Sequence, residues 1–204
     1  VAKLQKKCSS VYFYHLFFLY SLNFMGDAFH IRPLRDSDIH DVTTWSRIEG
    51  FAPGTGDVGI YKHTDQQGLW IGSIGDIPIG CIAGIRYNPA YGFIGLFLVK
   101  KEHRGQGYGL KLWNRAFEHL VDLPCVGLEA APDRIHDYSN WGFLPSSLTT
   151  RWELTRNETI SASRTANQLL NGLEILEGKS IPNNVVQAYD ANREPSPRPH
   201  FLSD

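Results

Sequence analysis

Residues 96–120 read LFLVKKEHRGQGYGLKLWNRAFEHL: a short apolar run, a basic loop rich in glycine, and a segment with apolar residues at helical spacing. The apolar run is predicted to be the end of a strand. In the last segment, apolar side chains recur at Leu110, Trp113, Phe117 and Leu120. This spacing predicts a helix with one apolar face. The glycines therefore lie between a strand and a helix, where unpaired backbone N–H groups and the helix dipole form an anion site.

The charge of this loop and helix differs from that of the whole chain. Within residues 100–115, five basic residues stand against one acid, Glu102, which gives a net charge of +4; they are Lys100, Lys101, Arg104, Lys111 and Arg115. The 204-residue chain has 20 Lys and Arg against 21 Asp and Glu, a net charge of −1. We therefore expect a multiply phosphorylated small ligand here, and we expect no nucleic-acid or membrane partner.

The flanking sequence predicts a mixed sheet. A strand at 29–33 precedes a helix capped by Asp36 or Ser37 that runs to about Gly50. Apolar runs at 69–74, 77–87 and 91–99 are separated by turns of two or three residues, and turns this short make the strands antiparallel. A strand at 125–130 follows the helix and can lie parallel to 91–99. A short helix over 133–141 and a hairpin from 142–144 to 148–154 complete an α/β (α+β) fold with helices on both faces.

The two ends of the chain are predicted to lie outside this domain. Residues 1–24 are interpreted as an N-terminal extension, 25–155 as the domain, and 156–204 as a linker or tail that begins a second domain. The apolar run from Val11 to Leu22 is too short to span a membrane. Three distant cysteines fit neither a disulfide framework nor a zinc site, so we expect a cytoplasmic protein without a metal.

Two common phosphate-binding motifs fit the glycine loop poorly. A Walker loop needs Lys-Ser or Lys-Thr after its glycines, and neither is present. A Rossmann loop has a closer match, since Glu129 lies 20 residues after Gly109, where a ribose ligand is expected. Its glycine spacing is G-x-G-x-x-G, however, whereas this loop has G-x-G-x-G after an antiparallel strand.

The loop instead resembles the pyrophosphate-binding motif [QR]-x-x-G-x-[GA] of the GCN5-related N-acetyltransferases, here with Arg104, Gly107 and Gly109. The segment from Tyr138 to Phe143 resembles the Y-x-x-x-G-F segment of the same family. The resemblance covers about residues 28–154 and includes the order of elements. Segments around Gly54, Gly80 and Gly95 resemble the YitH-like branch of the family, in which a second, smaller domain follows; that domain is expected to be missing from this chain.

The resemblance implies a binding site for acetyl-CoA as cosubstrate. The pantetheine arm would pair with the backbone of Phe97, Leu98 and Val99 where two parallel strands separate. The pyrophosphate would lie on Arg104, Gly105, Gln106, Gly107, Tyr108 and Gly109. Lys111 would contact the nucleotide phosphate, although it is also a normal residue for a solvated helix face.

The resemblance further implies acetyl transfer to a primary amine of a small molecule or peptide by direct attack in a ternary complex. Glu129 is a candidate base, because a lysine-like amine with a pKa of ~10.4 must lose a proton; a solvated carboxylate is the alternative. Tyr138 is a candidate proton donor to the thiolate, with a partly buried aromatic as the alternative. Two other functions stay open, a non-catalytic acyl-CoA-binding module and a Rossmann-type NAD-binding oxidoreductase.

Overall fold

The fold is described from a computed structural model in residues 2–7, 28–150, 176, 178–194, 196–199 and 201–202. Its strands are β1 (Ala2–Lys7), β2 (Phe29–Pro33), β3 (Leu69–Ile74), β4 (Ile77–Asn88), β5 (Tyr91–Val99), β6 (Cys125–Ala130) and β7 (Leu144–Leu148). Its helices are α1 (Ile39–Ile48), α2 (Asp57–Thr64), α3 (Tyr108–Leu120), α4 (Ile135–Asn140) and α6 (Asn183–Ala191).

The seven strands form one mixed sheet in the order β2-β3-β4-β5-β6-β1-β7. The strands β2 to β5 are antiparallel neighbours, and the turns that join β3, β4 and β5 contain only two residues each. The strands β5 and β6 are parallel, because α3 crosses between them. The predicted mixed, mostly antiparallel sheet is therefore confirmed, with the predicted fourth and fifth strands as its parallel pair.

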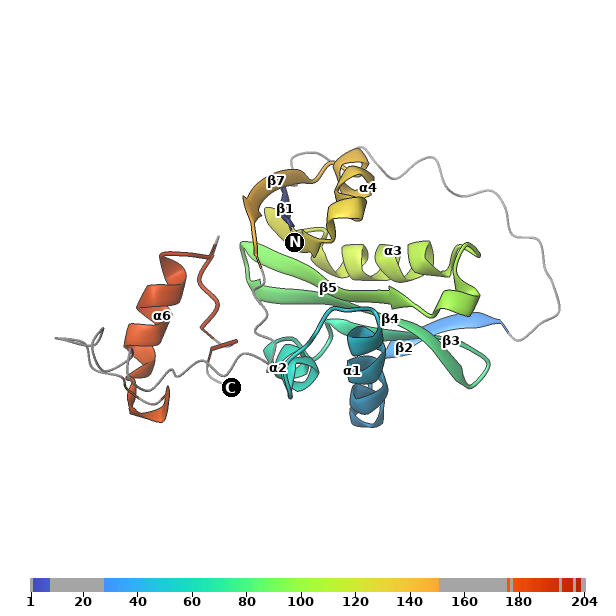
Figure 1. The fold of residues 1–204 in the computed structure, drawn as a ribbon, viewed down its shortest axis with the longest axis horizontal. Coiled ribbons are helices and arrows are strands. Elements are labelled where there is room, and N and C mark those ends of the chain that lie inside the picture. Colours follow the sequence, from blue (N-terminus) through green and yellow to red (C-terminus); the bar gives the residue numbers. More distant parts are fainter. Residues whose placement is uncertain are drawn as a thin grey trace, which may run out of the picture.

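Helices cover both faces of the sheet, α3 on one face and α1 with α2 on the other (Figure 1). Alternation along β5 sends Ile94 into the core beneath α3 and Phe93 into the core beneath α1 and α2. The core under α3 contains Trp70, Leu112, Trp113, Ala116 and Leu128. The opposite core contains Val42, Val58, Ile71, Ile85, Tyr87 and Tyr91. The parallel pair β5 and β6 thus lies between two packed layers.

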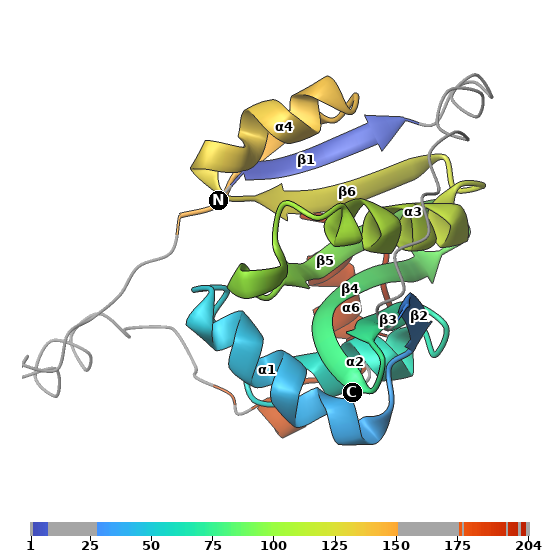
Figure 2. The same ribbon diagram turned by 90° about the vertical axis from the view of Figure 1, so that its right-hand side faces the viewer.

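Residues 2–7 of the predicted N-terminal extension form a strand of the sheet. Strand β1 lies beside β6 (Figure 2) and pairs antiparallel with it, with Ala2 opposite Ala130 and Lys7 opposite Cys125. It also pairs antiparallel with β7. The backbone N–H and C=O groups at the edge of a sheet can pair with any extended segment of suitable length. The side-chain pattern of residues 2–7 therefore does not predict this pairing. The apolar run from Val11 to Leu22 and the second half of the predicted final hairpin, 151–154, lie outside the described residues.

Two helices differ from the predicted order of elements. Helix α2 lies in a region with no predicted element and starts after Gly56, whose φ of 98° lies in the left-handed region. Helix α6 lies within the predicted C-terminal linker and starts directly after Pro182. Proline is tolerated at the start of a helix, because the N–H groups of the first turn have no helical partner. Pro182 therefore marks the start of this helix.

The register of β5 and β6 can be tested at Gly127. A Cβ added there would lie 2.3 Å from the hydroxyl oxygen of Tyr91. We expect Gly127→Ala to lower the free energy of unfolding by about 1–3 kcal/mol in urea denaturation, the usual cost of overpacking. The double variant with Tyr91→Phe should recover part of this loss, because the nearest atom is then the ring carbon Cζ at 3.1 Å. A Gly127→Ala protein as stable as the wild type would contradict this register.

Candidate active site

The parallel strands β5 and β6 are paired only at their N-terminal ends. Their register runs from Tyr91 opposite Cys125 to Ile94 opposite Leu128. Beyond these pairs β5 continues to Val99 and β6 to Ala130. The backbone of Phe97, Leu98 and Val99, the predicted pantetheine site, therefore lies along the part of β5 that does not pair with β6. This unpaired region is the gap between the two strands.

A β-bulge in β5 lies at the start of this gap. Opposite Cys81 and Ala83 of β4, β5 carries one extra residue between Gly95 and Leu98. This bulge places Leu96 at a φ of 48°. The left-handed conformation costs a non-glycine residue about 1–3 kcal/mol of conformational free energy. The Cys81 thiol donates a hydrogen bond to the Leu96 carbonyl oxygen at 3.2 Å, and burial raises the pKa of this thiol to about 12. Cys81 thus stays protonated and braces the bulge.

The glycine loop forms an open cradle at the start of α3. Gly105 and Gly107 have φ values of 76° and 81°, and Gly107 precedes the first residue of α3. A Cβ added to either glycine would meet no heavy atom within 4 Å. Gly109 differs, since its Cβ would lie 3.4 Å from the Phe97 ring, so this glycine allows α3 to approach β5. The open space beside the N-terminus of α3 fits a pyrophosphate.

Arg104 connects this loop to two other elements. Its Nε donates to the Val99 carbonyl oxygen at 2.7 Å, and its Nη2 lies 2.6 Å from the Glu49 carboxylate at the end of α1. The predicted contact between Arg104 and a phosphate is not tested by these partners. They do fix the position of the loop relative to β5, a role that the motif alone did not indicate.

The remaining predicted ligand residues line the same end of α3. Tyr108 stacks on Phe29 with ring centroids 4.7 Å apart. The ammonium group of Lys111 lies 5.4 Å from the Phe29 ring, and its side chain is exposed. Gln106 reaches the Glu102 carbonyl oxygen at 3.5 Å. The cradle is therefore bordered by an exposed cation on a stacked aromatic pair.

Tyr138 lies on α4, on the side of the sheet that carries α3. Its ring packs against Trp113, Trp141 and Phe143 at centroid distances of 5.7, 5.9 and 6.2 Å. Burial is the main cause that raises the pKa of Tyr138 above its ordinary value of 10. Its hydroxyl is therefore protonated at neutral pH, as a proton donor requires.

Glu129 lies on the opposite side of the sheet from Tyr138. It is exposed, and it follows Leu128, the last residue of β6 that pairs with β5. Leu128 and Ala130 point into the core under α3, so Glu129 points toward the layer of α1 and α2. The two candidate catalytic residues thus lie on opposite faces of the sheet.

A cluster of tyrosines beside Glu129 had no sequence-based prediction. Tyr61 of α2 and Tyr87 of β4 share a side-chain hydrogen bond, and both are largely buried. The pKa of Tyr61 is raised to about 12, mainly by burial and to a smaller extent by the charges of Asp57 and Glu129. Burial likewise raises the pKa of Tyr91. Only the three-dimensional fold brings Tyr61 to the other two tyrosines, because α2 is distant in sequence from the turn between β4 and β5.

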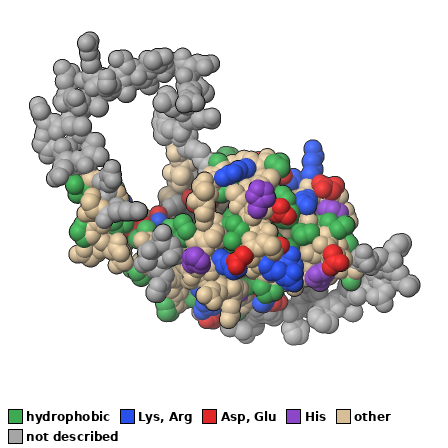
Figure 3. All heavy atoms as spheres, turned by 90° about the horizontal axis from the view of Figure 1, so that it is seen from below, with side chains coloured by type: hydrophobic (Ala, Val, Ile, Leu, Met, Phe, Trp, Pro, Cys, Tyr) green, Lys and Arg blue, Asp and Glu red, His purple; other side chains and the backbone are tan. Residues whose placement is uncertain are grey.

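The described residues contain no group of three or more His, Cys, Asp or Glu side chains arranged to hold a metal ion. Among the helices of this same part of the chain, none is long and apolar enough to cross a membrane. On the face that carries α1 and α2, basic and acidic side chains are interspersed (Figure 3).

Comparison with known proteins adds three findings. Residues 37–143, more than half of the chain, match the model of the acetyltransferase (GNAT) family. A holothin acyltransferase from Pseudoalteromonas sp. (strain SANK 73390) is 31% identical over 121 residues, which are 59% of this chain and 41% of that protein. The chain therefore spans less than half the length of this curated relative.

Solved structures support the same architecture. A putative acetyltransferase from Pyrococcus horikoshii aligns with a TM-score of 0.65 and 22% identity, over 93% of this chain and 64% of that one. Ard1 from Thermoplasma volcanium aligns with a TM-score of 0.53 and 21% identity, over 59% of this chain and 85% of that one. At these identities the two structures support the fold alone.

Proposed function

Because the chain belongs to the acetyltransferase (GNAT) family, we propose that it transfers the acetyl group of acetyl-CoA to a primary amine of a small molecule or peptide. The observation that carries this proposal is the gap between β5 and β6, which opens beside the glycine cradle at the start of α3. A relative named as an acyltransferase supports acyl transfer in general. The YitH-like branch, with a second domain, and a cytoplasmic location stay predictions.

Acetyl-CoA would be held mainly by backbone groups. The amides of residues 104–109 and the N-terminus of α3 would receive the pyrophosphate, with Lys111 at its edge. The backbone of Phe97, Leu98 and Val99 would pair with the pantetheine arm along the gap. Backbone recognition of this kind depends on the positions of the bulge and loop, which Cys81 and Arg104 support.

The reaction would be a direct displacement at the acetyl carbonyl carbon. The amine nitrogen forms the new C–N bond, the C–S bond breaks, and the amine proton leaves to Glu129 or to water beside it. Tyr138 gives a proton to the departing sulfur, which leaves as the thiol of CoA. Glu129 suits its role because it is exposed and follows the last residue of β6 that pairs with β5, and Tyr138 suits its role because its hydroxyl is protonated at neutral pH.

Titration of acetyl-CoA into the full chain tests this proposal. Isothermal titration should give micromolar binding of acetyl-CoA and no binding of NADH, and a thiol reagent should detect CoA release with an amine panel. Binding without CoA release would favour the alternative of a non-catalytic acyl-CoA-binding module. Binding of NADH alone would overturn the proposal; the fold already argues against it, because β5 belongs to an antiparallel meander.

Glu129→Gln tests the role of the candidate base. We expect kcat/KM for an amine to fall about tenfold at pH 7, since exposed water can replace part of the proton transfer. The loss should shrink as the pH approaches ~10, where amines lose their own proton. Glu118→Gln, an exposed glutamate on α3, is the matched control and should leave the rate unchanged. A pH-independent loss would indicate that Glu129 does not act as a base.

A further inference from the structure

The C-terminal segment 196–202 is anchored to the domain at two places. The Asn88 side-chain amide at the end of β4 donates to the Ser196 hydroxyl at 2.8 Å and to the Pro197 carbonyl oxygen at 2.5 Å. Phe201 packs against Tyr87 and Tyr61, with ring centroids 5.4 and 6.2 Å apart. A segment more than a hundred residues distant in sequence therefore becomes part of the core beneath α2.

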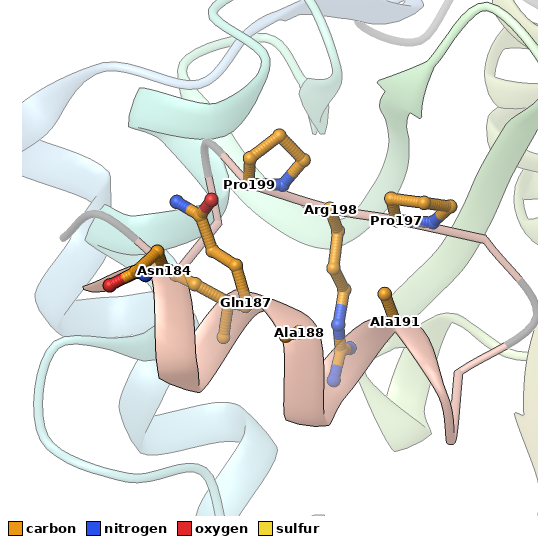
Figure 4. A pocket seen from close by; sticks show the side chains of 8 residues that line it. Asn184, Gln187, Ala188, Ala191, Pro197, Arg198 and Pro199 are labelled. Carbon is orange, nitrogen blue, oxygen red and sulfur yellow. The ribbon is translucent and has the colours of Figure 1, made fainter. Parts of the chain in front are cut away.

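Helix α6 supports this segment from its outer side. The Arg198 side chain extends from the segment toward α6, where its Nη2 lies 2.8 Å from Asp190 and 3.4 Å from Glu194 (Figure 4). A hollow of about 320 Å³ lies between the two, lined by Asn184, Gln187, Ala188, Ala191, Pro197, Arg198, Pro199 and Leu202. The ion pairs neutralise the Arg198 charge and fix the segment that carries Phe201.

A second, smaller hollow lies between Phe201 and α2. Its volume is about 90 Å³, and its walls are Asp57, Ile60, Tyr61 and Phe201. This volume equals that of about three water molecules. It suits a single apolar group such as a ring, and it is too small for a sugar chain.

The Tyr61 side chain connects this hollow with the candidate active site. The Tyr61 hydroxyl lies 3.6 Å from the position that a Cβ on Gly95 would occupy. Gly95 directly follows Ile94, the last residue of β5 that pairs with β6. The ring of Tyr61 therefore extends from the hollow to the point where the two strands separate.

The charges around the hollow favour a cation. Asp57 and Glu129 both lie near enough to Tyr61 for their negative charges to raise its pKa. The Arg198 guanidinium also lies on this side, 4.9 Å from the centroid of the Phe201 ring, and its charge is balanced by Asp190 and Glu194. Aromatic faces also attract an ammonium group.

We propose that Tyr61 and Phe201 form the walls of the acceptor pocket and that Phe201 selects monoamines with a flat apolar body next to the amine. This inference rests on the proposed acetyl transfer. The apolar body would lie between the two rings, and the amine would lie toward Glu129 and the gap. The C-terminal segment thus determines acceptor specificity without contributing to the acetyl-CoA site.

Two amines of equal charge test the proposal. With saturating acetyl-CoA, the full chain should acetylate 2-phenylethylamine with a kcat/KM at least tenfold above that of ethanolamine. Phe201→Ala should lower the value for 2-phenylethylamine at least tenfold, mainly through KM, and leave ethanolamine within twofold. Tyr189→Ala on exposed α6 is the matched control and should change neither value. Phe201→Leu keeps an apolar side chain, so its preference for 2-phenylethylamine over ethanolamine should lie between those of the wild type and of Phe201→Ala.

Three outcomes would overturn the proposal. These are equal rates with both amines, an equal loss for both amines in Phe201→Ala, and a loss that appears in acetyl-CoA affinity instead of acceptor KM. If acetyl-CoA is not used at all, the proposed function fails separately. Direct titration of 2-phenylethylamine into wild type and Phe201→Ala then decides the pocket by itself, since only the wild type should bind.

Discussion

Replacing Gly107 with aspartate is expected to lower the affinity for acetyl-CoA more than a hundredfold. Gly107 has a φ of 81° and precedes α3, and the space where its Cβ would lie is open. An aspartate there fills the cradle with a carboxylate that repels the pyrophosphate. Two charges about 4 Å apart near a protein surface interact by about 4 kcal/mol, enough for this loss. Isothermal titration with acetyl-CoA measures it.

Gly56→Asp controls for backbone strain. Gly56 precedes α2 as Gly107 precedes α3, has a φ of 98°, and also has open space around its Cβ position. Both variants should lose a similar amount of thermal stability, because both place a side chain in the left-handed region. Only Gly107→Asp should lose acetyl-CoA binding. Equal affinities in the two variants would place the pyrophosphate elsewhere.

The glycine loop and the sheet were predictable because their signals are local. The strand, the loop and the helix occupy consecutive residues, and the two-residue turns make β3, β4 and β5 antiparallel whatever else the chain does. The apolar spacing along α3 indicates which side faces the sheet. These features place the candidate pyrophosphate site within about 25 consecutive residues, and the structure contains the predicted strand and helix on either side of the loop.

The supports of the site were not predictable, because each joins distant elements. The bond from Cys81 to Leu96 depends on a bulge, and a bulge leaves no pattern in side chains. The pair between Arg104 and Glu49 depends on where α1 ends against β5. The contact of Phe201 with Tyr61 joins residues that are far apart in the sequence. Sequence periodicity describes which face of an element is buried, and it does not identify the partner.

Replacing Tyr138 with phenylalanine is expected to lower kcat about a hundredfold, the lower end of what a general acid contributes. The ring contacts with Trp113, Trp141 and Phe143 should persist, so the affinity for acetyl-CoA and the unfolding temperature should stay near wild type. Burial raises the pKa of Tyr138 above its ordinary value, so the phenol keeps its proton at neutral and mildly alkaline pH. The wild-type rate should therefore show no loss due to Tyr138 between pH 6 and about pH 8. Pre-steady-state CoA release, followed with a thiol reagent, measures the step itself.

Tyr91→Phe separates loss of a proton donor from loss of any buried phenol. Tyr91 also has a raised pKa due to burial, but it lies at the paired end of β5, opposite Cys125 and three residues before the strands separate. Its replacement should change stability and leave kcat within about twofold. If Tyr138→Phe and Tyr91→Phe retain equal rates, the thiolate takes its proton from water, and the aromatic cluster around Trp113 has a purely structural role. If only Tyr138→Phe loses turnover while acetyl-CoA still binds, the chain is a catalyst, because a non-catalytic acyl-CoA-binding module has no step for this hydroxyl to accelerate.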